Sequence, residues 1–276
     1  MTAHPKVTLV TCKSMPNLFK GEEGLLDELA ARGCDPQIKV WNDPDVDWSE
    51  AGMVVVRSVS DYASDRPAFL EWTKQLRRVQ NSADVLNWNT DKHYLKELAA
   101  LGMPTIPTNW LEPEQNLSKH QIHTRFPAFG EFVVKPAVSS GVRDIGRYTT
   151  VDTRQRQAAM RQVQGLLGEG RSVMIQRYVE EIDLHGEISL VFFNGLVSHA
   201  VEKRSALHPS SVSDPSAHEA VVTAEAADSV AWKWGEEIRR VLHGYVRSRL
   251  GHDEQFLFNR VDLVPDGKGS FLVMEV

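Results

Sequence analysis

Residues 130–148 read GEFVVKPAVSSGVRDIGRY, an apolar strand pattern that ends in a lysine and runs into a loop of small residues. Lysine is rarely buried without a partner, and ordering a flexible loop costs chain entropy. The serines and glycines after Lys135 let the backbone approach a ligand closely, and backbone N–H groups in such loops bind phosphate oxygens. The stretch therefore predicts a strand and loop that bind an anion. An edge-strand lysine kept for solubility is the alternative, and Lys135 alone does not exclude it.

The segments on either side of this stretch predict the rest of the fold. Residues 1–88 alternate short β-rich runs with helical patterns, which is typical of a parallel sheet flanked by helices. Residues 89–177 favour a two-layer α+β unit. Residues 178–276 contain two hairpin patterns, one around an Asn-Gly turn and one around an Asp-Gly turn, separated by a long helix. The sequence thus predicts an α/β (α+β) chain of three units with these boundaries.

A linker helix is expected between the first two units. Thr90 is a suitable N-cap, Leu95 and Leu98 belong to an apolar stripe, and Gly102 marks the end of the helix. The helix would carry the chain from the parallel sheet into residues 89–177.

Composition limits the function classes. The 276 residues are 42% hydrophobic and 25% charged, as in ordinary soluble proteins, and the net charge of -6 argues against a general nucleic-acid binder. Cys12 and Cys34 lack metal-ligand spacing, and His185, His199 and His208 lack zinc spacing. Without a membrane span or signal-peptide pattern, we expect a cytoplasmic protein with a small-molecule partner and no nucleic-acid or membrane partner. A homo-oligomer such as a dimer is left open.

Two acidic residues interrupt apolar runs near the C-terminus. Asp262 in NRVDLV and Glu275 in LVMEV would be buried at high cost unless they are paired or bound to metal. A turn at Asp266-Gly267 would place both at comparable depth on neighbouring strands, where two hard oxygen ligands suit Mg²⁺. The alternative is a structural salt bridge, for example to Arg260, which would leave Glu275 unexplained.

A strand that runs into an acidic segment, VMIQRYVEEID, provides a candidate nucleotide contact. Backbone groups of Tyr178 and Val179 could contact an adenine ring, and Glu180 or Asp183 could accept hydrogen bonds from a ribose. Acidic loops are common, so this signal is weak by itself.

Taken in order, these motifs resemble the ATP-grasp superfamily, close to glutathione synthetase and the ribosomal-protein glutamate ligase. The motifs are a lysine before GMPTIPT, then FVVKPAVSSGVRDIG, IQRYVEEID, RVDLV and MEV. The resemblance covers nearly the whole chain, including an N-terminal domain of the kind that precedes the grasp. More narrowly, VWNDPDVDW, VVVRSVSDY and HGEISLVFFNGLVSHAVEKR are similar to the cycloserine-forming ATP-grasp ligases.

The resemblance implies a site for ATP and Mg²⁺. It implies that Lys92 and Lys135 contact the phosphates and that Ser139, Ser140 and Gly141 form the loop that covers them. Gln176, Tyr178 and Val179 would line the adenine slot, with Asp183 at the ribose. Asp262 and Glu275 would bind the metal. The family's third metal ligand, an acidic or amide residue, is expected after Val276.

The narrower resemblance implies the positions around the substrate. These are Arg57, Ser58, Ser139, Arg143 and Glu187, with Arg57, Arg143 and Lys203 in catalytic roles and Lys203 near the γ-phosphate. Arg57 ends an apolar strand pattern, where a guanidinium would face the cleft of a parallel sheet and suit a carboxylate. A strand-end salt bridge is the alternative for Arg57, and a plain loop position is the alternative for Ser139.

The resemblance therefore implies a ligase that activates a carboxylate as an acyl phosphate, with ADP and phosphate as products. Its nearest subgroup implies cyclisation of O-ureido-D-serine to D-cycloserine. An intermolecular carboxylate–amine ligase, a small-molecule kinase and a non-catalytic ATP-binding regulatory module are the alternatives. The loops at residues 138–146 and 207–218 are expected to order over the ligand and exclude water.

Overall fold

The computed structural model describes residues 4–19, 21–22, 24–203, 207 and 229–276. The chain divides into two compact units. The N-terminal unit comprises residues 1–90 with 254–257, and the main unit comprises residues 91–253 with 258–276. The predicted boundary between residues 89–177 and 178–276 lies within the main unit and stays a prediction.

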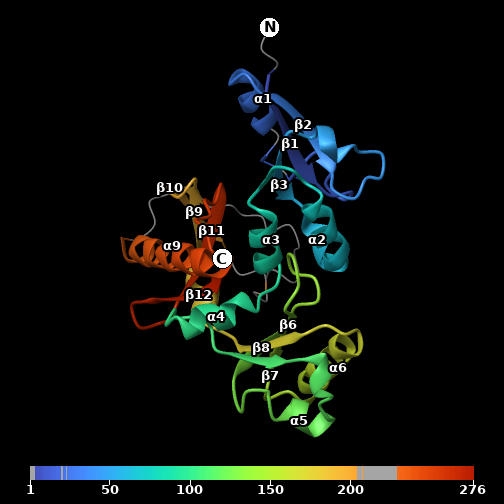
Figure 1. Cartoon of the computed structure of the whole chain (residues 1–276). Helices are drawn as coiled ribbons and strands as arrows, with labels where there is room; N and C mark the ends of the chain where they lie inside the picture. The colour runs from blue at the N-terminus through green and yellow to red at the C-terminus, as the bar shows by residue number, and fades with distance from the viewer. Residues whose placement is uncertain (1–3, 20, 23, 204–206, 208–228) are drawn as a thin grey trace. The chain divides into compact units, whose positions relative to one another are not determined.

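The N-terminal unit is a parallel sheet with helices, as its alternating pattern predicted (Figure 1). The strand order is β2-β1-β3-β4, with β1 (Lys6–Thr11), β2 (Asp35–Val40), β3 (Met53–Ser58) and β4 (Val79–Gln80). Its helices are α1 (Gly24–Ala31), α2 (Arg66–Lys74) and α3 (Ala83–Asn89). Two buried aromatic residues of α2, Phe69 and Trp72, pack with Val10 and Val54 of the sheet and with Trp41, which follows β2, and so stabilise this unit.

The predicted helix start at Thr90 was wrong. Thr90 follows the end of α3, where its N–H donates to Leu86 O at 3.1 Å and its hydroxyl donates to the same carbonyl at 2.7 Å. The N-cap of α3 is Ser82, so a helix that the sequence reading missed already occupies the segment before Thr90. The expected linker helix is α4 (Tyr94–Ala100), which begins after His93.

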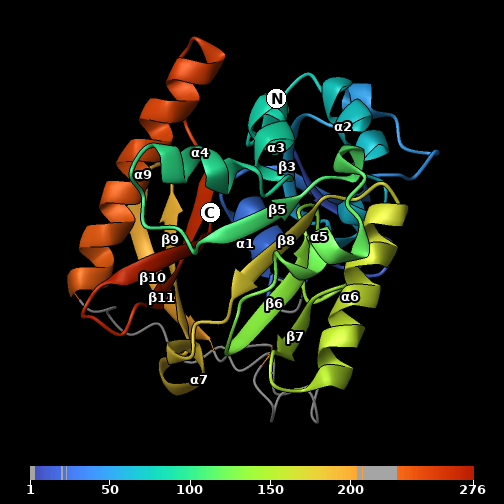
Figure 2. The same ribbon diagram turned by 90° about the horizontal axis from the view of Figure 1, so that it is seen from below.

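One sheet of the main unit has the order β5-β8-β6-β7 and is antiparallel. Its strands are β5 (Thr108–Leu111), β6 (Glu131–Pro136), β7 (Gly146–Thr149) and β8 (Val173–Arg177). Helices α5 (Lys119–His123) and α6 (Thr153–Gly168) cover one face (Figure 2) and bury Phe132, Val134 and Ile175. Because side chains alternate along a strand, Val133, Lys135 and Gln176 face the opposite side.

The other sheet of the main unit has the order β10-β9-β11-β12. Its strands are β9 (Glu187–Phe193), β10 (Leu196–Lys203), β11 (Phe258–Pro265) and β12 (Phe271–Glu275), with α7 (Glu181–His185) before β9 and α9 (Ser229–Leu250) before β11. Helix α9 lies against β9 and β11 in Figure 2. Both predicted hairpins are confirmed, and Asn194 and Gly195 turn with φ values of 52° and 77°.

A bulge in β12 shapes the site. Asp262 pairs with Glu275, whereas Leu263 pairs with Val273, so Met274 is an extra residue in β12. A bulge re-aims side chains because it breaks the strict alternation of the strand. Met274 and Glu275 consequently both line the same pocket although they are consecutive. Asp262 and Glu275 lie at comparable depth on neighbouring strands, as predicted.

Among the helices in the described ranges, none is both long enough and apolar enough to cross a membrane.

Candidate active site

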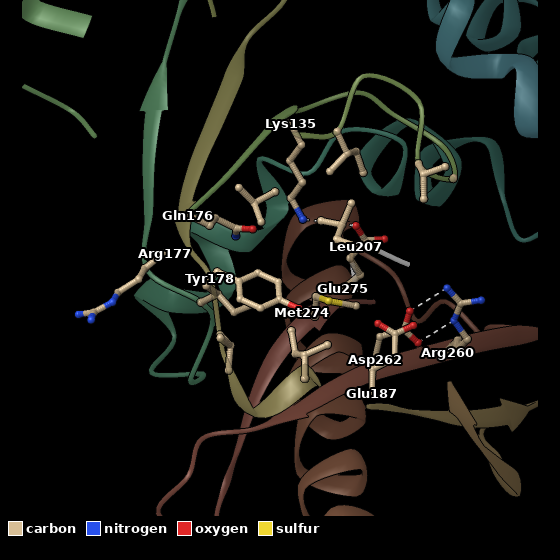
Figure 3. Close-up of a pocket in the computed structure, with 17 residues that line it drawn as sticks. Lys135, Gln176, Arg177, Tyr178, Glu187, Leu207, Arg260, Asp262, Met274 and Glu275 are labelled. Atoms are coloured by element: carbon tan, nitrogen blue, oxygen red, sulfur yellow. Dashed lines mark hydrogen bonds and ion pairs between the residues drawn. The ribbon is translucent and has the colours of Figure 1, made fainter. Parts of the chain in front are cut away.

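The main unit contains a pocket of about 280 Å³ that is lined by residues from both of its sheets (Figure 3). One part of the lining is apolar. Ile106, Val133, Tyr178 and Ile182 line the pocket here and form a buried cluster with Val264 behind them. Further lining residues pack against this cluster, among them Ile145, Val179, Leu207 and Met274. This part of the pocket suits a flat apolar ring. Tyr178 and Val179, which we predicted at the adenine, lie here.

The other part of the lining carries one buried lysine, Lys135, and a second buried lysine, Lys92, lies nearby outside the lining. Lys135 is 6% exposed and Lys92 is 7% exposed. Both ammonium groups approach the same carboxylate oxygen, Oε1 of Glu275, at 3.8 Å for Lys135 and 3.6 Å for Lys92. Burial lowers the pKa of Lys135, and Glu275 opposes that shift. Two cations that share one carboxylate leave an excess of positive charge, which an anionic ligand would neutralise.

Lys92 also holds the loop that follows Lys135. Its Nζ donates to Ser139 O and to Ser139 Oγ, each at 3.0 Å, while the Lys92 N–H donates to Ala137 O at 3.0 Å. Gly141 from this loop lines the pocket. Ser140 is half-buried and Arg143 is exposed, and neither belongs to the lining. The strand-and-loop motif of residues 130–148 is thus bound through Lys92 to the segment that precedes α4.

Three carboxylates from adjacent strands line this side of the pocket: Glu187 from β9, Asp262 from β11 and Glu275 from β12. Arg260 forms two hydrogen bonds with Asp262, Nε to Oδ1 and Nη2 to Oδ2, both at 2.7 Å. Lys203 Nζ lies 3.7 Å from Glu187 Oε1. Burial raises the pKa of Glu187 to about 7, and the negative charge of Asp262 adds to the shift. The two Arg260 hydrogen bonds show that the structural salt bridge, which we considered as the alternative role of Asp262, is present.

The donor set fits a magnesium ion, although the described residues contain no ready-made group of three metal-ligating side chains. Asp262 is 3% exposed and directly opposite Glu275. Burial and the nearby negative charges of Asp262 and Glu275 raise the pKa of Glu187, and a divalent cation beside these carboxylates would oppose that shift. Asp262 and Glu275 would hold Mg²⁺ through carboxylate oxygens, as hard cations prefer.

Glu187 provides a pH-dependent test of this charge balance. Its folded-state pKa of about 7 lies above its ordinary value of 4.5, so the folded state binds more protons than the unfolded state between these pH values. Its contribution to stability must therefore fall as the pH rises from about 4.5 to about 7. We expect the Tm of the wild type, relative to Glu187→Gln, to fall between pH 5 and pH 8 in metal-free buffer. Added Mg²⁺ should reduce the fall, and parallel pH profiles for the two proteins would contradict the assignment.

Arg147 is a pocket-side residue that the sequence reading missed. Its guanidinium lies 3.7 Å from the ring centroid of Tyr178, donates to both carboxylate oxygens of Asp183 at 3.1 and 2.8 Å, and pairs with Glu131. Tyr178 also donates its hydroxyl hydrogen to Asp183. Asp183, predicted at the ribose, is therefore engaged by two side chains. Alternation along β7 could have placed Arg147 on the same face as Ile145, but its partners have no sequence signal.

The predicted substrate residues Arg57 and Ser58 lie in the N-terminal unit, at the end of β3. The guanidinium of Arg57 pairs with Glu22, and the hydroxyl of Ser58 donates to the other carboxylate oxygen of Glu22 at 2.5 Å. Arg57 therefore does bind a carboxylate, one supplied by the chain itself. Glu22 was missed because it lies 35 residues before Arg57, with no local pattern linking the two.

His185 pairs with Glu181 at 3.3 Å, and His199 contacts Ser198 at 2.9 Å, so neither lies in the pocket lining. His208 and the proposed covering segment after Leu207 lie outside the described residues.

Comparison with known proteins gives three consistent likenesses. The family model for the N-terminal domain of D-cycloserine synthetase DcsG matches residues 7–87. The cycloserine biosynthesis protein DcsG of Streptomyces lavendulae is 32% identical over 260 residues, which is 91% of this chain and 83% of that protein. A crystal structure of D-cycloserine synthetase DcsG matches with a TM-score of 0.82 and 30% identity, covering 98% of this chain and 90% of that chain.

A more distant likeness concerns the fold alone. D-alanyl-alanine synthetase A from Vibrio cholerae O1 biovar eltor matches with a TM-score of 0.67 at 15% identity, covering 100% of this chain and 89% of that chain.

Proposed function

Because the chain belongs to the D-cycloserine synthetase family of ATP-grasp carboxylate–amine ligases, we propose that it uses ATP and Mg²⁺ to close O-ureido-D-serine to D-cycloserine. Family membership confirms the predicted ATP-grasp fold and the ligase class. The identity of the substrate and the intramolecular character of the reaction are the parts that we propose.

The observation that carries the proposal is the charged part of the pocket. Lys92 and Lys135 are buried beside Glu275, and Asp262 lies directly opposite Glu275 on the neighbouring strand. Buried cations next to buried carboxylates are costly unless a ligand uses both. A nucleoside triphosphate would interact with both, because its phosphate oxygens accept hydrogen bonds from the lysines and bind the same metal ion as the carboxylates.

In this proposal the chain positions the reactants and neutralises their charge. Lys135 and Lys92 donate to phosphate oxygens, and the loop from Ser139 to Gly141 covers them with backbone N–H groups. The apolar part of the pocket holds the adenine, with Gln176, Tyr178 and Val179 around it. Mg²⁺ on Asp262 and Glu275 would supply charge neutralisation at the transferred phosphoryl group.

In this proposal a small set of polar and charged side chains binds and positions the amino-acid substrate. Arg57 or Arg143 would hold its carboxylate, with Ser58, Ser139 and Glu187 as further substrate contacts and Lys203 near the γ-phosphate. Arg57 can do so only when Glu22 yields its place, since Glu22 pairs with it.

The carboxylate takes the γ-phosphoryl group of ATP to give an acyl phosphate and ADP, and the nitrogen bonded to the serine side-chain oxygen then attacks the acyl carbon and expels phosphate. Water removes the carbamoyl group as carbon dioxide and ammonia. Because the nitrogen is tethered to the acyl group, the closing step benefits from a high effective concentration.

The test is to incubate the protein with ATP, Mg²⁺ and O-ureido-D-serine as the single organic substrate, then to measure ADP, phosphate and the cyclic product by mass. We expect all three in equal amounts. Release of ADP and phosphate only when a separate amine or amino acid is added would show an intermolecular ligase, the second candidate. Formation of ADP without phosphate would indicate a kinase.

The loop that covers the phosphates should respond to nucleotide. In residues 138–146, Val142 is 52% exposed while Gly141 lines the pocket. We expect slower amide hydrogen exchange in this loop when an ATP analogue and Mg²⁺ are added, because a covering loop must exclude water from an acyl phosphate. The same expectation applies to residues 207–218. Equal exchange rates with and without the analogue would count against the covering role.

A further inference from the structure

We propose that Thr108 is a positioning residue for nucleobase selection, because its hydroxyl orients the Gln176 amide so that the carbonyl oxygen is available to the pocket. The inference rests on the proposed function, since it assumes that the base of ATP occupies the apolar part of this pocket. Thr108 would thereby influence which nucleotide binds without touching it, because it acts on Gln176.

The sheet places Gln176 between one polar and one apolar neighbour. Thr108 of β5 is its cross-strand partner on one side, and Val133 of β6 is its partner on the other. Gln176 is 4% exposed, and both Gln176 and Val133 line the pocket. Figure 3 shows the Gln176 amide beside the pocket between Lys135 and Tyr178. Val133 offers no polar side-chain group, so Thr108 is the flanking side chain that can orient the amide.

The hydrogen bonds of Thr108 determine which end of the amide it accepts. Thr108 Oγ1 donates to Ile106 O at 2.9 Å, and a carbonyl oxygen can only accept. The single hydroxyl hydrogen is thereby used, so Thr108 Oγ1 can only accept from Gln176. The amide nitrogen Nε2 of Gln176 donates to it at 2.8 Å. If the amide were flipped, Gln176 Oε1 would face Thr108 Oγ1, whose hydrogen is already donated to Ile106. One hydrogen bond would then be lost.

The consequence is an oriented acceptor. With Nε2 held by Thr108, Gln176 Oε1 is left for a ligand, and within the described part of the chain no donor reaches it. The 6-amino group of adenine can donate to this oxygen, whereas guanine carries a carbonyl at the same position. A site built to accept a hydrogen bond disfavours an analogue that presents an acceptor, because two buried oxygens then face each other. The arrangement therefore favours adenine over guanine nucleotides.

The test compares ATP and GTP affinities, measured calorimetrically with Mg²⁺, for the wild type and Thr108 variants. Thr108→Val keeps the side-chain shape and Thr108→Ala is a second variant without the hydroxyl. We expect both to lower the ratio of ATP to GTP affinity about tenfold, because the amide can then turn its nitrogen toward the base. Thr108→Ser restores the hydroxyl and should restore the ratio. Thermal unfolding of each variant checks that the fold is retained.

A double substitution separates amide orientation from a general structural effect. Glutamate at position 176 has only acceptor oxygens when ionised, so it cannot present a donor by flipping. Thr108→Val should therefore leave the ATP-to-GTP ratio unchanged in a Gln176→Glu background. An equal fall in that background would overturn the inference, as would an unchanged ratio in both Thr108→Val and Thr108→Ala.

The wild-type measurement distinguishes the two levels of proposal. Equal binding of ATP and GTP by the wild type would overturn the selection inference while leaving the ligase proposal standing. Absence of binding by either nucleotide would overturn both.

Discussion

Replacing Lys135 with methionine is expected to lower the affinity for ATP roughly 10- to 100-fold, the usual loss for one or two charge-assisted hydrogen bonds. Lys135 lies on the pocket face of β6, and its ammonium group lies 3.8 Å from Glu275, where a phosphate oxygen could replace that carboxylate as its partner. Methionine fills a similar volume without the charge, so the loss would report the missing donor.

The same variant should stay folded. Burial lowers the pKa of Lys135, which means that the folded protein disfavours the charged form relative to water. Removing that charge should leave the Tm of the nucleotide-free protein unchanged or raise it, because Glu275 keeps Lys92 as a partner at 3.6 Å. ATP affinity and thermal unfolding are therefore measured together, and the affinity should fall while the Tm does not.

Lys92→Met is the matched variant. We expect a comparable loss of ATP affinity, together with faster amide exchange around Ser139, because Lys92 Nζ also binds Ser139 O and Oγ at 3.0 Å. Retention of wild-type affinity by both variants would exclude the phosphate role of the two lysines. Retention by Lys135→Met alone would move the phosphate contact to Lys92.

Local patterns predicted the parts of this site that depend on strand alternation and turns. The Asp-Gly turn predicted a hairpin with Asp262 and Glu275 at comparable depth on neighbouring strands, whereas their direct pairing depends on the bulge at Met274. Lys135 was identified because a charged residue ended an apolar strand pattern before a loop of small residues. Each of these inferences needed only neighbours within one hairpin or one strand and loop.

Contacts between distant segments could not be predicted in the same way. Glu22 pairs with Arg57, and Arg147 joins Glu131 to Asp183, through side chains that tertiary packing brings together. The start of α4 was misplaced because Thr90 has the side chain of an N-cap residue but lies at the C-terminal end of α3, whose own N-cap is Ser82. The bulge at Met274 likewise has no local signal.

Replacing Asp262 with asparagine is expected to lower kcat roughly 100- to 1000-fold, as when one preorganised charge stabiliser is removed from an active site. Asparagine keeps the shape and one oxygen of the side chain but removes the negative charge that a hard cation prefers. The concentration of Mg²⁺ required for half-maximal activity should rise at the same time. Initial rates of phosphate release over a series of Mg²⁺ concentrations measure both effects.

Arg260→Met decides whether Asp262 serves as a metal ligand or as a structural partner. Without metal this variant should have a lower Tm, because Asp262 is 3% exposed and loses two hydrogen bonds of 2.7 Å. Mg²⁺ should restore much of that Tm, since the unpaired carboxylate becomes a better ligand, and the Mg²⁺ requirement should stay the same or fall. If Asp262 only anchored Arg260, the two variants would lose activity alike and added Mg²⁺ would rescue neither Tm. A higher Mg²⁺ requirement in Asp262→Asn, together with an unchanged or lower requirement in Arg260→Met, would thus establish Asp262 as a metal ligand whose metal-free charge is balanced by Arg260.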